Sequence, residues 1–149
     1  MIRAIIICVL ISVAGCVSDS GPPTGSEKSE ATAALADRIK FIEQYVTFDR
    51  EYVDLEYDVF YQNNGTGFGV PGPSDWDIRL VAIVPPEQIQ DWVPTDGVEA
   101  TAPASDWLQN TAQKIDVSSI NQWYLNGSTL IGIDRDNSVV AFRSNTMGQ

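Results

Sequence analysis

The stretch VDLEYDVFY, residues 53–61, alternates apolar and polar side chains with a period of two. This period predicts a half-buried antiparallel strand, with one face toward a core and the other toward solvent. The core face would consist of Val53, Leu55, Tyr57, Val59 and Tyr61, and the other face of Asp54, Glu56, Asp58 and Phe60. Residues 76–84 alternate in the same way after a loop rich in Asn, Gly and Pro. The two stretches therefore predict neighbouring strands of one sheet.

A helix is predicted just before this strand, over residues 29–48, with Ser29 available as its cap. Apolar residues recur along it at the helical period, as expected for a helix that covers a sheet. The stripe consists of Leu35, Ile39, Ile42 and Val46. The alternative is an amphipathic helix that binds a partner.

Shorter elements follow the second strand. Short helices are predicted near residues 86–92 and 105–115, and short strands over 122–125, 129–133 and 138–143, with a tight turn at Asn126-Gly127. Residues 29–149 are thus predicted to form one small α+β domain. In it, an N-terminal amphipathic helix packs on an antiparallel sheet of about five strands, accompanied by two short helices.

The charge balance restricts the function. The chain has 149 residues, with 9 basic against 20 acidic residues and a formal charge of −11. Nucleic-acid binding needs a basic face that displaces counterions, so this partner is not expected. The sequence contains no His, which removes the commonest general base, and only two cysteines, Cys8 and Cys16.

The N-terminus, MIRAIIICVLISVAGC, has the parts of an export signal. Arg3 precedes an apolar run to Ala14 that is too short to span a bilayer, and small residues follow it. Residues 1–15 are therefore predicted to be a signal peptide. The alternative is a buried N-terminal strand or helix.

The end of this run, Val13-Ala14-Gly15-Cys16, resembles the lipobox of bacterial lipoproteins. The resemblance covers only the first 16 residues, and Val13 stands where Leu is commonest. It implies that Cys16 is joined to diacylglycerol, that the signal is cut before it, and that its new amino group is acylated. Several acyl chains would anchor the protein stably to a lipid bilayer. An ordinary signal cut nearby is the alternative.

Residues 16–28 would then comprise the lipidated Cys16 and a flexible tether rich in Ser, Gly and Pro. In proteobacterial lipoproteins an Asp after the lipidated Cys favours the inner membrane. Here that position holds Val17, so the resemblance implies the outer membrane, facing the periplasm, if the source is Gram-negative.

Asp75, Trp76 and Asp77 form the most conspicuous candidate site. Two carboxylates beside an aromatic ring are typical of a sugar- or peptide-binding surface, or of glycosidase acid/base chemistry. A capping Asp beside a core Trp is the structural alternative.

The remaining acidic residues do not indicate a metal site, and no cofactor is expected. Asp54, Glu56 and Asp58 are explained by an exposed strand face. Residues 134–138 resemble a calcium loop only at its start, because the sixth and twelfth positions hold Val139 and Asn145, so a hairpin turn is expected. Of the four tryptophans, two or three are expected in the core.

These observations predict a noncatalytic, membrane-anchored binding module of the cell envelope that binds a protein partner. Because this chain is strongly acidic, a basic partner is expected. An immunity-type protein against a periplasmic toxin is a sharper version. An accessory subunit of an envelope machine and a carboxylate-dependent cell-wall hydrolase are the alternatives.

Overall fold

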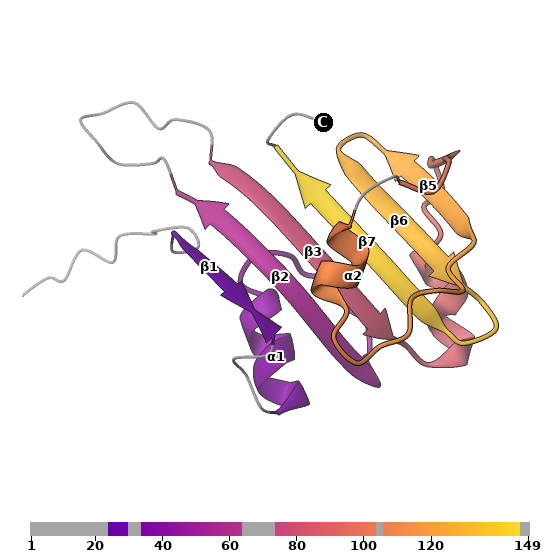
Figure 1. Cartoon of the computed structure of the whole chain (residues 1–149), viewed down its shortest axis with the longest axis horizontal. Helices are drawn as coiled ribbons and strands as arrows, with labels where there is room; N and C mark the ends of the chain where they lie inside the picture. Colours follow the sequence, from indigo (N-terminus) through magenta and orange to yellow (C-terminus); the bar gives the residue numbers. More distant parts are fainter. Residues whose placement is uncertain (1–23, 30–33, 64–73, 104–105, 147–149) are drawn as a thin grey trace, which may run out of the picture.

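The computed structural model describes residues 24–29, 34–63, 74–103 and 106–146. They form one antiparallel sheet in the order β1-β2-β3-β7-β6-β5-β4 (Figure 1). The strands are β1 (Gly25–Lys28), β2 (Asp54–Gln62), β3 (Asp75–Ile83), β4 (Val98–Glu99), β5 (Gln122–Asn126), β6 (Thr129–Asp134) and β7 (Val139–Asn145). The helices are α1 (Leu35–Ile42), the 3₁₀ helix η2 (Pro86–Trp92) and α2 (Trp107–Thr111). The prediction of a small α+β domain built on an antiparallel sheet is confirmed.

The sheet has seven strands, so the expectation of about five was too low. The two extra strands, β1 and β4, are its edges. β1 falls within residues 16–28, which were predicted to be a flexible tether. For these four residues that prediction was wrong. Gly25–Lys28 has no strand-like apolar pattern; it is extended because its backbone pairs with the open edge of β2, from Gly25 opposite Tyr61 to Lys28 opposite Asp58.

Helix α1 is shorter than predicted, since it begins at Leu35 and ends at Ile42. Its first residue follows Ala34, which makes no side-chain cap, so Ser29 does not cap this helix. Of the predicted stripe, only Ile42 is fully buried, whereas Leu35, Ile39 and Val46 are half-buried. The helix packs against β2 next to the edge strand, which leaves its flanks accessible.

Helices lie on both faces of the sheet, not on one face alone. The first face is covered by α1, the segment after it and η2, and its core contains Leu55, Tyr57, Val59, Ile78, Leu80, Ala82, Ile133, Val140 and Phe142. The second face is half covered by α2 and residues 112–120, and its core contains Val81, Trp107, Leu108, Ile115, Val117, Trp123, Val139 and Ala141. Helix α2 contacts β3 and, less extensively, β2, and Figure 1 shows it lying over β3.

One glycine allows an aromatic ring to lie on the second face. Trp123 and Gly132 are directly opposite each other on β5 and β6. A Cβ atom at position 132 would lie 2.7 Å from the Trp123 ring and 2.8 Å from Ile120. Because a rigid indole and a β-branched side chain cannot both move away, this position requires glycine.

The antiparallel register gives the sheet two distinct ends. The end where β1 begins, called here the tether end, carries Gly25, Gln62, Asp75 and Asn145. The opposite end, called the far end, carries Asp54, Ile83, Asp134 and Val139. Any segment that precedes Gly25 therefore meets the domain at the tether end (Figure 1).

Candidate functional site

The predicted trio at the start of β3 is divided between the two faces of the sheet. Successive side chains of a strand point to opposite sides, so Trp76 lies on the first face and Asp75 and Asp77 on the second. The Trp76 indole donates a hydrogen bond to Ser144 Oγ at 3.2 Å. It also lines a shallow groove of about 410 Å³ together with Tyr45 and Tyr61. The structure therefore does not bring the three side chains into one surface.

Asp77 is the centre of an ion-pair network on the second face. Its carboxylate accepts hydrogen bonds from Arg143 at 3.0 Å and from Arg79 at 2.5 Å. Arg79 also contacts Asp58 at 3.3 Å, and Lys28 of β1 lies 3.8 Å from the same carboxylate. Burial by itself would raise the pKa of Asp77, but the hydrogen bonds and charges of Arg143 and Arg79 outweigh it and lower that pKa below 3.8.

Glu56 was predicted to lie on an exposed acidic face of its strand, and this prediction is wrong. Its side chain is buried, and its carboxylate accepts backbone N–H groups from Gln113 at 2.8 Å, Lys114 at 3.0 Å and Ile115 at 3.3 Å. These three donors follow α2 and have no strand partner, so the carboxylate takes the place of a backbone acceptor. Asp54 instead forms an ion pair with Arg38 of α1 at 2.8 Å.

Asp134 confirms the hairpin interpretation of residues 134–138. The chain turns there between β6 and β7, and Asp134 Oδ1 accepts the backbone N–H groups of Asp136 and Asn137. Ser119 and the Asn137 amide donate to its other oxygen. Burial would raise the pKa of Asp134, but these donors together lower it.

Three of the four tryptophans, Trp92, Trp107 and Trp123, are buried in the two cores, in agreement with the expectation of two or three. Trp76 is only half-buried.

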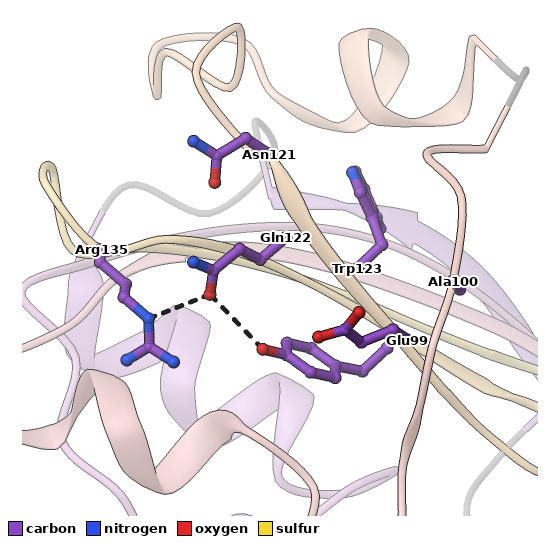
Figure 2. Close-up of a pocket in the computed structure, with 7 residues that line it drawn as sticks. Glu99, Ala100, Asn121, Gln122, Trp123 and Arg135 are labelled. Carbon is purple, nitrogen blue, oxygen red and sulfur yellow. Dashed lines mark hydrogen bonds between the residues drawn. The ribbon is translucent and has the colours of Figure 1, made fainter.

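A polar pocket at the β4–β5 edge was not predicted. It has a volume of about 320 Å³ and is lined by Glu99, Ala100, Asn121, Gln122, Trp123, Tyr124 and Arg135. Arg135 donates to Gln122 Oε1 at 3.0 Å (Figure 2). Through Nη1 it also donates to Gln90 Oε1 at 2.6 Å. Gln90 lies 45 residues before Arg135 in the chain, so no local spacing indicates this arrangement.

The far end of the sheet is acidic. Exposed carboxylates there come from the segment before β2, from η2, from the loop before β5 and from the β6–β7 turn: Glu51, Glu87, Asp91, Asp116 and Asp136. None of these takes part in the ion pairs found in the described part of the chain. Arg50, Lys114 and Arg135 lie on the same segments; Arg50 stacks on Trp92 at 4.6 Å, and Arg135 donates hydrogen bonds to two glutamines. Since these five carboxylates outnumber the three cations, this end carries an excess of negative charge.

The described segments contain no group of three or more Cys, Asp or Glu side chains placed to hold a metal ion. No helix among them is long and apolar enough to cross a bilayer. Cys16 and the lipobox lie outside the described residues. Comparison with protein-family models, curated proteins and solved structures finds no match to this chain.

Proposed function

We propose that this chain is a lipid-anchored, noncatalytic binding module of the bacterial cell envelope that captures a basic protein partner with its acidic far end. The observation that carries the proposal is the opposition of the two ends. The polypeptide enters the sheet at Gly25, at the tether end, while Glu87, Asp91 and Asp136 are exposed at or beside the far end.

Lipid anchoring at Cys16 would orient the two ends of the sheet relative to the bilayer. Eight residues separate Cys16 from Gly25, so the two residues can lie at most about 32 Å apart when the chain between them is fully extended. The tether end would therefore stay near the bilayer, and the far end would point away from the anionic lipid headgroups. A surface held in this orientation is accessible to partners that diffuse in the adjacent compartment.

The charge distribution supports a basic partner. Exposed carboxylates that outnumber the cations at one end create a local negative potential, which accelerates encounter with a basic protein. The inner carboxylates are engaged otherwise: Asp77 holds two arginines, and Glu56 and Asp134 hold backbone N–H groups. Because these carboxylates stabilise the fold, they favour a binding function over acid/base catalysis.

Replacing Cys16 with serine is expected to abolish both lipid attachment and signal removal, because serine supplies no thiol for the diacylglycerol linkage. Intact-mass measurement of the membrane fraction checks this. The parent should lack residues 1–15 and carry the mass of the lipid, and the variant should retain the full leader. A parent protein with an unmodified N-terminus at another residue would contradict the anchor.

Neutralising three far-end carboxylates, by Glu87→Gln, Asp91→Asn and Asp136→Asn together, is expected to slow association with a basic probe about tenfold at low salt. The probe is a 20-residue polylysine, and the association rate is measured by stopped-flow fluorescence on the full chain in nanodiscs. At physiological salt the difference should shrink, because charges are screened beyond about 8 Å.

The matched control carries Glu43→Gln, Asp96→Asn and Asp106→Asn, three exposed acids just after α1, before β4 and just before α2. Both triple variants have the same net charge, so only the position of the removed charges differs. Equal slowing of the two variants would contradict capture by the far end and would leave only an effect of total charge.

A further inference from the structure

The pocket at the β4–β5 edge holds a cation and an anion that do not pair with each other. Arg135 is fixed by the amide oxygens of Gln122 and Gln90, which orient its guanidinium without neutralising it. A guanidinium has five N–H donors, and these two bonds leave the Nη2 group available. In a chain of charge −11, an arginine positioned by two neutral side chains is suited to an anionic group from outside.

Glu99 provides the opposite charge in the same pocket. It lies directly across from Tyr124 in the β4–β5 register, and both side chains are on the first face. The Tyr124 hydroxyl donates to Gln122 Oε1 at 3.4 Å, which places the ring beside the glutamine that holds Arg135. Figure 2 shows the Glu99 carboxylate on the same side of the strand as Gln122 and Arg135, whereas Trp123 points to the other side.

We propose that this pocket binds a small zwitterion, namely an α-amino acid or a dipeptide, with its carboxylate on Arg135 and its ammonium on Glu99. The volume of about 320 Å³ is at the small end of the range for ligand pockets. A ligand with both charges satisfies both side chains, and its zero net charge avoids repulsion by the acidic body. The inference goes beyond the proposed function, since it requires neither the anchor nor a basic partner.

Three alanine dipeptides test the proposal: L-alanyl-L-alanine, its N-acetyl derivative without the ammonium, and its C-terminal amide without the carboxylate. Binding to the full chain in detergent micelles is measured by ligand-observed NMR titration. The free dipeptide is expected to bind about tenfold more tightly than either blocked form, since each blocked form loses one charge-assisted hydrogen-bonded contact.

Two variants assign the contacts. Arg135→Gln should weaken binding of the free dipeptide about tenfold and remove its advantage over the amide, while Glu99→Gln should remove its advantage over the N-acetyl form. Lys114→Gln and Glu43→Gln make the same charge changes outside the pocket and should leave affinity unchanged. Thermal unfolding midpoints equal to that of the parent establish that the variants are folded.

Equal affinity for the three dipeptides, no saturable binding of any of them, or unchanged affinity in Arg135→Gln would each overturn the zwitterion site. The far-end triple variant should bind the dipeptide as the parent does, because its three replaced residues do not line the pocket. Failure of this proposal is therefore distinguishable from failure of the proposed function.

Discussion

Replacing Glu56 with alanine is expected to lower the free energy of unfolding by about 3–5 kcal/mol, because it removes one partner of a buried, charged hydrogen-bonded group. The N–H groups of Gln113, Lys114 and Ile115 would lose their acceptor, and the segment after α2 would lose its attachment to β2. A domain of this size has a total stability of about 5–15 kcal/mol, so the loss is a large fraction of it. Urea unfolding of the full chain, followed by tryptophan fluorescence, measures the effect.

Two further variants show whether the carboxylate is responsible. Glu56→Gln keeps the shape and one acceptor oxygen, so it should lose only about 1–2 kcal/mol. Glu51→Ala removes an exposed glutamate just before the same strand and should change stability by less than about 0.5 kcal/mol. If Glu56→Ala behaved like Glu51→Ala, the backbone contacts of Glu56 would have no role in stability.

Replacing Asp77 with asparagine is expected to lower the free energy of unfolding by about 1–3 kcal/mol at neutral pH. The Asp77 side chain is only 12% exposed, and its loss of charge would leave Arg79 and Arg143 without their shared anion. Both arginines are about one quarter exposed, so water compensates part of the loss and keeps it below that of Glu56→Ala. Asp91→Asn, at an exposed carboxylate, is the control and should be nearly neutral.

The effect of Asp77→Asn should depend on pH with a defined sign. Because its pKa in the folded protein is lower than the ordinary 3.8, the ionised carboxylate stabilises the fold fully above about pH 5. This contribution is lost as the pH falls through the folded-state pKa, which lies below 3.8. The difference between parent and variant should therefore be constant near neutrality and shrink below pH 4. A difference that grew on acidification would contradict the network.

The sequence by itself determined the centre of the sheet. Strict alternation over 53–61 and 76–84 predicted two strands, and the structure pairs them along their length as β2 and β3. It also indicated a turn at Asn126-Gly127; in the structure Asn126 ends β5 and the turn is formed by Gly127 and Ser128, with Gly127 at a φ of 59° that favours glycine. These features are local, since a period of two and a turn residue act through neighbouring backbone geometry.

Only the tertiary structure decided the second face, the edges and the pocket. Alternation assigned Glu56 to solvent, but α2 and the segment after it cover that face and bring three backbone donors to its carboxylate. β1 became a strand because β2 offered an unpaired edge, a property of the assembled sheet and not of Gly25–Lys28. Arg135 acquired its orientation from Gln90, on a different element. In each case the deciding partner lies far along the chain, and local periodicity carries no information about it.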